Sequence, residues 1–194
     1  MNFENLLNTE KIVKDYSELN LDFNQSYLKS YPIFIDYFKS LDQIKYENLV
    51  ISSHFVYGWM PTILHLGEIE IERTIDILNK TKTNQNLSYE DIELIKKNIN
   101  NSMVGTSKLF HFINPENFAI WDSRIVRYIT GNKYSYGIDK HENYIEYNYI
   151  LKNVVCANHN IQEILKEFKT KFNHPISDLR AIELIIFEID KNNN

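Results

Sequence analysis

The sequence predicts an all-α fold, a compact bundle of about nine or ten helices, and three observations support this prediction. Gly and Pro are scarce, with 5 and 4 copies in 194 residues, whereas a fold of many strands needs more turn residues. Apolar residues recur at steps of three and four along most of the chain, as they do on one face of a helix. Hydrophobic residues make up 43% of the chain, which is enough to form a buried core.

The first half of the chain contains five segments with this helical spacing. They cover residues 3–16, 27–41, 49–57, 69–78 and 88–99. Pro32 is a start or a kink of the second segment, because proline has no backbone N–H donor. Ser88 begins the fifth segment, and Asp91 three residues later makes a pattern close to a capping box.

In the second half, residues 101–107 predict a turn, 108–113 a short helix, and 114–117 a break. Another helix follows Asp122. The last three predicted helices cover residues 144–155, 161–172 and 177–189. We expect one helical domain over residues 1–190, either a single bundle or two lobes with a cleft between them, and a disordered tail over 191–194.

Composition and charge exclude several classes of protein. The net charge of -5 argues against coating nucleic acid through bulk positive charge, but it permits a local basic patch. The single cysteine, Cys156, excludes an internal disulfide framework and a cysteine-based zinc site. We find no P-loop, dinucleotide fingerprint or metal-binding histidine pattern, and therefore expect neither a cofactor nor a metal.

The start of the chain lacks a basic segment followed by an apolar one, so no signal peptide is visible. No apolar run approaches the roughly 20 residues that a membrane span needs. We therefore expect a cytoplasmic protein that makes no membrane contact. The oligomeric state stays open, with a monomer as the expectation.

The least generic part of the sequence is residues 104–125. A Gly turn followed by Thr106 and Ser107 offers free backbone N–H groups at the start of a helix. Such groups, together with the helix dipole, bind an oxygen anion such as phosphate, and Lys108 adds a positive charge. Asp122 follows the apolar residues 119–121, so we expect its carboxylate at the edge of an apolar cleft.

This segment resembles the helix-hairpin-helix DNA glycosylase superfamily, and more closely its small bacterial branches that are similar to 8-oxoguanine glycosylases. Gly105-Thr106-Ser107-Lys108 is similar to the hairpin that grips DNA phosphate, and Asp122-Ser123-Arg124-Ile125 to the segment with the catalytic Asp. Residues 178–183 also resemble the way those branches end. The resemblance is specific over residues 104–125 and loose over the remainder. It implies a helical glycosylase fold and excision of a damaged or modified base from DNA.

Two departures from the family pattern bear on the reaction. Bifunctional members carry a Schiff-base lysine a few residues earlier relative to the Asp, where this chain has Met103 and Val104. The hairpin also has one Gly where the pattern usually has two. The resemblance therefore implies monofunctional excision, with Lys108 as a second catalytic group or a phosphate ligand. The shortage of cysteine excludes the iron–sulfur cluster that some members carry.

The resemblance implies three groups of site residues. Asp122 is the catalytic carboxylate, which stabilises an oxocarbenium-like sugar and orients or deprotonates water. The DNA backbone is bound by Val104, Gly105, Thr106, Ser107, Arg124 and Arg127. The base, flipped out of the duplex, enters a pocket formed by His54, Tyr57, Trp59, Met60, His111 and Trp121.

Structural interpretations of the same residues stay open. Asp122 is a good helix N-cap, Lys108 is typical of a solvated helix face, and the aromatic residues are typical of a core. Arg180 and Glu183, three residues apart on one helix, favour a structural ion pair. Two further functions also stay open: a DNA-binding module of the same fold without chemistry, and a helical protein-interaction domain.

Overall fold

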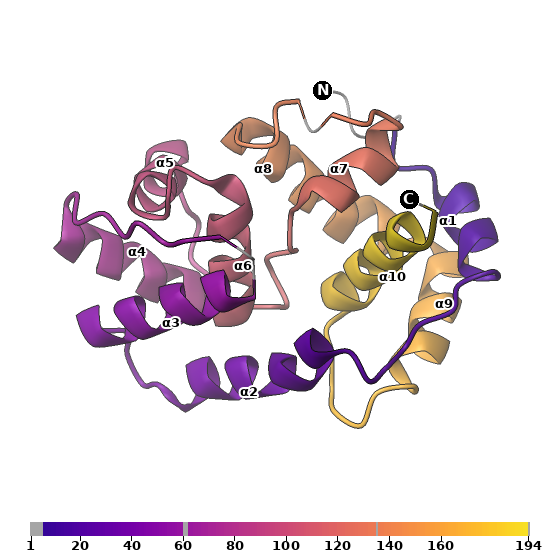
Figure 1. Ribbon diagram of the computed structural model, residues 1–194, viewed down its shortest axis with the longest axis horizontal. Coiled ribbons are helices and arrows are strands. Elements are labelled where there is room, and N and C mark those ends of the chain that lie inside the picture. Colours follow the sequence, from indigo (N-terminus) through magenta and orange to yellow (C-terminus); the bar gives the residue numbers. More distant parts are fainter. Residues whose placement is uncertain (1–5, 60–61, 135, 194) are drawn as a thin grey trace.

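The computed structural model describes residues 6–59, 62–134 and 136–193, and it confirms the all-α prediction. Within these residues, the strand-like pairing consists of one antiparallel bridge between Leu66 and Ile99. The helices are α1 (Thr9–Tyr16), α2 (Ser26–Ser40), α3 (Tyr46–Gly58), α4 (Ile71–Lys82), α5 (Tyr89–Asn98), α6 (Met103–Ile113), α7 (Ser123–Thr130), α8 (His141–Ile150), α9 (His159–Lys169) and α10 (Asp178–Asn193) (Figure 1). A π-helical segment, Leu151–Val155, continues α8.

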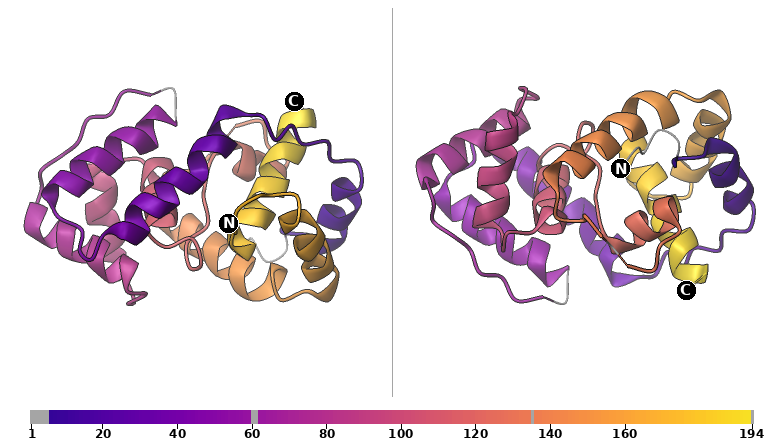
Figure 2. Two further views of the ribbon diagram at one scale, coloured as in Figure 1. Left: turned by 90° about the horizontal axis from the view of Figure 1, so that it is seen from below. Right: turned by 90° about the horizontal axis from the view of Figure 1, so that it is seen from above.

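Helix α6 lies at the centre of the molecule, where it packs against α2, α3, α4, α5 and α8. Helix α10 packs against α7, α9 and α1. The views in Figure 2 show α3 to α6 gathered toward one end of the long axis, and α1, α7, α9 and α10 toward the other. Residues 114–122 connect α6 to α7 and so join the two ends of the molecule.

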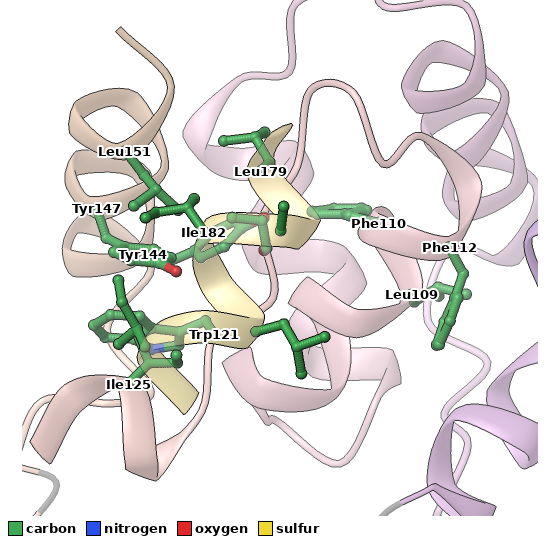
Figure 3. Close-up of a cluster of buried hydrophobic side chains, with 14 of the residues drawn as sticks. Leu109, Phe110, Phe112, Trp121, Ile125, Tyr144, Tyr147, Leu151, Leu179 and Ile182 are labelled. Atoms are coloured by element: carbon green, nitrogen blue, oxygen red, sulfur yellow. The ribbon is translucent and has the colours of Figure 1, made fainter. Parts of the chain in front are cut away.

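Buried apolar side chains from both ends belong to one contiguous hydrophobic cluster. Figure 3 shows Trp121 and Ile125 beside Tyr144 and Tyr147 of α8, with Ile182 of α10 close by. The indole of Trp121 packs on the ring of Tyr147 at a centroid distance of 4.8 Å. This packing anchors the start of α7, which carries Asp122 as its N-cap.

Local sequence signals explain where several helices begin. The capping box predicted at Ser88 is present, since Ser88 Oγ accepts from the Asp91 amide and Asp91 Oδ2 accepts from the Ser88 amide. Pro32 lies inside α2 and not at its start. None of the helices within the described ranges is long and apolar enough to cross a membrane.

Two predicted boundaries are wrong. Helix α6 begins at Met103, so residues 103–107 are helical, and the turn lies before them at Asn100 and Asn101, with φ of 55° and 51°. Asn tolerates this left-handed conformation, so these residues and not Gly105 make the turn. Helix α10 continues through Asn193, beyond the predicted boundary at residue 190, and the Lys191 ammonium lies 3.2 Å from Glu188 Oε1.

Candidate functional site

A pocket of about 110 Å³ lies beside Asp122 at the start of α7 and is partly open to solvent. Its walls come from α2, the end of α3, α6, the segment before α7, and α10. The residues that line it are Tyr27, Trp59, Lys108, Ile120, Asp122, Arg180, Glu183, Leu184 and Phe187. One lysine, one arginine and two acidic side chains thus share a small pocket whose walls are partly aromatic.

The side chain of Ser107 fixes the position of the pocket's two central residues. Its Oγ accepts a hydrogen bond from the Trp121 amide at 3.0 Å and donates one to the Trp121 carbonyl at 3.2 Å. Both residues are buried, so these bonds replace hydration of the backbone. Since Lys108 follows Ser107 and Asp122 follows Trp121, the two bonds bring Lys108 and Asp122 to the same pocket.

Asp122 acts as the N-cap of α7, as the structural interpretation predicts. Its Oδ1 accepts hydrogen bonds from the amides of Arg124 at 2.9 Å and Ile125 at 3.2 Å. Within the described residues, Oδ2 accepts no hydrogen bond. Capping therefore fixes the orientation of the carboxylate and leaves its second oxygen available for a ligand.

Lys108 lies almost entirely out of contact with solvent, with an exposed fraction of 9%. Burial lowers the pKa of its ammonium group, although Asp122 and Glu183 raise that pKa through their negative charges. In the part of the chain that the structure describes, no hydrogen bond or ion pair holds this amine. A buried cation without a partner is costly, so Lys108 is poised to bind a ligand or to react as a neutral amine. Its predicted alternative role on a solvated helix face is wrong.

Arg180 and Glu183 form the ion pair that their spacing favours, and both side chains are buried. Burial raises the pKa of Glu183 to about 7, although the adjacent Arg180 lowers it. The Arg180 guanidinium also lies over two rings, 4.8 Å from the centroid of Tyr31 and 5.7 Å from that of Trp59. The pair therefore does more than stabilise α10, because it also forms part of the pocket wall.

Among the residues predicted for the base pocket, Trp59 lines the pocket with Asp122. Tyr57 and Trp121 are instead buried core residues, and their polar atoms are bonded to the backbone. The Tyr57 hydroxyl donates to the Ile99 carbonyl at 3.3 Å, and Trp121 Nε1 donates to the Ile138 carbonyl at 2.8 Å. The plain-core interpretation of these two aromatics therefore fits the structure better.

The two histidines of the predicted pocket also lie outside it. His54 is exposed on α3, with Nδ1 2.7 Å from the Val50 carbonyl. His111 is fully buried, with Nδ1 2.6 Å from the Phe118 carbonyl and Nε2 2.9 Å from the Tyr31 hydroxyl. Burial lowers the pKa of His111 to about 3, which keeps its ring neutral. Met60 lies outside the described residues.

The predicted phosphate-binding turn is wrong in its local structure. Gly105, Thr106 and Ser107 are buried within α6, and Val104 is half-buried. The Gly105 amide is already bonded to Ser102 Oγ at 3.3 Å, so this segment offers no row of free N–H groups. Gly105 is required by close packing, because a Cβ there would lie 2.7 Å from the Tyr57 hydroxyl oxygen.

The other two predicted phosphate ligands, Arg124 and Arg127, lie in a broad basic hollow between α7 and the end of α10. Its lining residues are Lys11, Arg124, Arg127, Tyr128, Gly131, Lys133, Asp190, Lys191 and Asn193. Arg127 Nε donates to Asp190 Oδ1 at 2.9 Å. Arg124 lies over the ring of Phe187, 5.3 Å from its centroid, and Phe187 also lines the Asp122 pocket. The hollow and the pocket are therefore neighbours.

Sequence reasoning did not assign Tyr27, Glu183 or Phe187 to the site. The available signal was the presence of Arg180 and Glu183 among the apolar residues of α10. Charged residues are rarely buried unless they are paired. The described ranges contain no group of three or more side chains placed to hold a metal ion.

Comparison of the chain with protein families, curated proteins and solved structures gives no match. The functional argument therefore rests on the residues and on the geometry of the pocket.

Proposed function

We propose that this protein is a monofunctional DNA glycosylase that excises a damaged or modified base, with Asp122 as its catalytic carboxylate. The observation that carries the proposal is the placement of Asp122. Its carboxylate lines a pocket with aromatic walls together with an unpartnered buried lysine, beside a basic hollow. Excision of this kind serves DNA repair or defence against phage DNA with modified bases.

The electrostatics of the pocket suit cleavage of an N-glycosidic bond. As that bond breaks, the sugar carbon becomes positive and the departing base becomes negative. The fixed carboxylate of Asp122 stabilises the positive sugar and orients a water molecule for attack. Lys108, when protonated, stabilises the negative base. Both groups work in a partly desolvated space, where such interactions are stronger than in water.

The basic hollow supplies the contact with the sugar-phosphate backbone in this proposal. Lysine and arginine side chains bind phosphate without reading sequence. Arg124 lies over Phe187, so a strand held in the hollow passes the mouth of the pocket. A nucleotide from that strand can then turn into the pocket.

The test is incubation of the purified protein with duplexes that carry one altered base each, followed by alkali to cleave abasic sites. We expect cleavage with at least one duplex, and its loss in Asp122→Asn while DNA binding is retained. Cleavage that survives in Asp122→Asn argues against the catalytic role of Asp122. No abasic sites across a broad panel argue against the enzyme and favour a DNA-binding module.

A second reaction course, with a lyase step, is favoured by the burial and lowered pKa of Lys108. In it the neutral amine attacks the sugar carbon, a C–N bond forms as the bond to the base breaks, and the base leaves with a proton. The C1′–O4′ bond of the sugar then opens while the remaining proton on the amine nitrogen moves to the ring oxygen, which leaves an imine between Lys108 and the opened sugar. Borohydride reduces this imine to a stable protein–DNA link. Borohydride cross-linking that Lys108→Gln abolishes supports this course, and abasic sites without cross-links support the water-attack course.

A further inference from the structure

The size of the Asp122 pocket limits the kind of base that it can hold. Its volume is about 110 Å³, whereas a cavity of about 150 Å³ is enough for one benzene ring. The pocket is thus smaller than a cavity that encloses one benzene ring, and because it is partly open to solvent, a single six-membered ring enters only in part, with its sugar-bearing edge outside the mouth. A purine, which carries a second fused ring, exceeds this space.

The wall formed by Trp59 is held in place from several sides. Its Nε1 donates to Ser30 Oγ at 2.8 Å. Its ring meets that of Phe112 edge to face at 4.9 Å and stacks on Tyr31 at 6.2 Å between centroids. Arg180 lies against it as well. Because these neighbours belong to α2, α6 and α10, Trp59 cannot withdraw without disturbing three helices.

The part of the wall next to Trp59 is fixed in the same way. The Tyr27 hydroxyl donates to Glu188, a buried carboxylate that also contacts Lys191. The Tyr27 ring meets those of Trp59 and Phe187 edge to face, at 5.9 and 6.1 Å between centroids. Tightly packed walls of this kind resist expansion, so the small volume is a property of the fold.

The polar side chains in the pocket suit an occupant with polar edge atoms. Lys108 and Arg180 carry nitrogen atoms that donate hydrogen bonds, and Asp122 and Glu183 carry carboxyl oxygens that accept them. A base ring with both donors and acceptors on its edge therefore finds partners in the pocket.

We propose that the substrate base has a single ring, which means an altered pyrimidine and not a purine. This inference rests on the proposed glycosylase function and narrows its substrate class. It follows from the volume of the pocket and from the fixed positions of Trp59 and Tyr27. The wall aromatics stack on the face of the ring, and the polar groups meet its edge.

The experiment compares excision of uracil, 5-hydroxyuracil and 5-hydroxymethyluracil with excision of 8-oxoguanine, hypoxanthine and 3-methyladenine, each in the same duplex. We expect single-turnover rates at least ~10-fold higher for the best single-ring base than for any purine, the scale on which pocket size discriminates. Equal or faster excision of a purine overturns the inference and leaves the glycosylase function standing.

A binding assay separates this inference from failure of the enzyme itself. The chain has two tryptophans, of which Trp59 lines the pocket and Trp121 is buried, so a ring in the pocket quenches Trp59 fluorescence. We expect quenching of the Asp122→Asn protein by free 5-hydroxyuracil and none by hypoxanthine at the same concentration. Quenching by hypoxanthine alone, or by neither base, overturns the inference whether or not the protein excises bases.

Variants that enlarge the pocket test the cause of the selectivity. In Trp59→Leu and in Phe187→Ala we expect the ratio of purine to pyrimidine excision, or of their quenching where Trp59 remains, to rise severalfold. Phe55→Leu is the matched control, because it shortens a ring on the same helix that does not line the pocket, and its ratio should stay at the wild-type value. An unchanged ratio in both pocket variants overturns the inference.

Discussion

Ser107 and Trp121 are joined by two hydrogen bonds between one hydroxyl group and the backbone of one residue, at 3.0 and 3.2 Å. The bonds connect α6 to the segment that leads into α7. Each partner is followed by a residue that lines the pocket, Lys108 and Asp122. The geometry of the candidate site therefore depends on a serine that makes no contact with the pocket itself.

Ser107→Ala should destabilise the protein by about 1–3 kcal/mol, because the two buried hydrogen bonds between Ser107 and the Trp121 backbone are lost. It should also lower the excision rate at temperatures where the variant is fully folded, since Asp122 is then less well fixed. Urea unfolding and single-turnover rates measure the two effects. Ser40→Ala is the control, because Ser40 is exposed and its hydroxyl donates to the Tyr37 carbonyl of its own helix. A wild-type rate in Ser107→Ala would contradict a positioning role.

Substitutions of Asp122 should separate capping from catalysis. Asn is as good an N-cap as Asp, so Asp122→Asn should keep the stability of the wild type, whereas Asp122→Ala should lose ~1 kcal/mol. Both variants should lose excision activity, because neither has a carboxylate. Thermal unfolding and the abasic-site assay provide the two measurements. Activity that follows stability, with Asn active and Ala inactive, would show that Asp122 serves only as a cap.

Glu183 should make the free energy of unfolding fall as the pH rises from about 4.5 to about 7. Burial raises the pKa of Glu183 to about 7 from its ordinary 4.5, so the folded state binds the proton more tightly than the unfolded state. The contribution of this proton is complete below pH 4.5 and is lost as the pH rises to about 7.

Comparison with Glu183→Gln isolates this effect from other titrating groups, such as His111. The stability of the wild type relative to the variant should fall by on the order of 3 kcal/mol between pH 4.5 and 7. Urea unfolding of both proteins across this range is the measurement. A constant difference would mean that Glu183 titrates at its ordinary pKa.

Gly105→Ala should destabilise the protein by about 1–3 kcal/mol, although helix propensity alone favours Ala. The added Cβ would lie 2.7 Å from the Tyr57 hydroxyl oxygen and 2.9 Å from Ile99 Cγ2. Tyr57→Phe in the same chain should recover part of the loss, as it removes the nearest atom. The control is Gly58→Ala, where an added Cβ meets nothing within 4 Å. Equal stability effects at the two glycines would be inconsistent with close packing at α6.

Lys133→Ala should weaken DNA binding by a similar factor for all sequences and reduce the slope of affinity against salt by about 1. The reason is that Lys133 is an exposed member of the basic hollow. Lys166→Ala removes an exposed lysine from α9, outside this hollow, and should leave the slope unchanged. Electrophoretic or fluorescence titrations between 50 and 200 mM salt are suitable. If both substitutions reduce the salt slope equally, the DNA does not bind specifically in the basic hollow.

The sequence was sufficient to predict the helical class, because apolar spacing is a local property. The same local information misplaced the start of α6. Gly105, Thr106 and Ser107 are residue types typical of turns, but packing against Tyr57 and Trp121 holds them inside a helix. Such contacts join residues from separate helices, and no short window of sequence contains them.

The sequence was sufficient to single out Asp122 as a candidate site residue, but it did not predict most of the residues that form the pocket around it. Asp122 stood out because an acid follows an apolar run, and capping confirmed that it begins a helix. The wall residues Tyr27 and Glu183 come from helices far away in the chain, and only the tertiary arrangement brings them to Asp122. The prediction that His54 and His111 line the pocket was wrong. Both lie near aromatic residues in the sequence, but their side chains do not reach the pocket in the folded structure.

Helix α10 contributes four of the pocket's lining residues, Arg180, Glu183, Leu184 and Phe187. It is the last helix that the ribosome makes among those described, and the first pocket residue, Tyr27, is made long before it. From the synthesis of Asp122 until α10 is complete, the nascent chain thus carries Asp122 and Lys108 without the residues of α10 that line the pocket around them. The pocket can therefore form only late in synthesis. A chain that ends before α10 would lack four of the residues that line the Asp122 pocket.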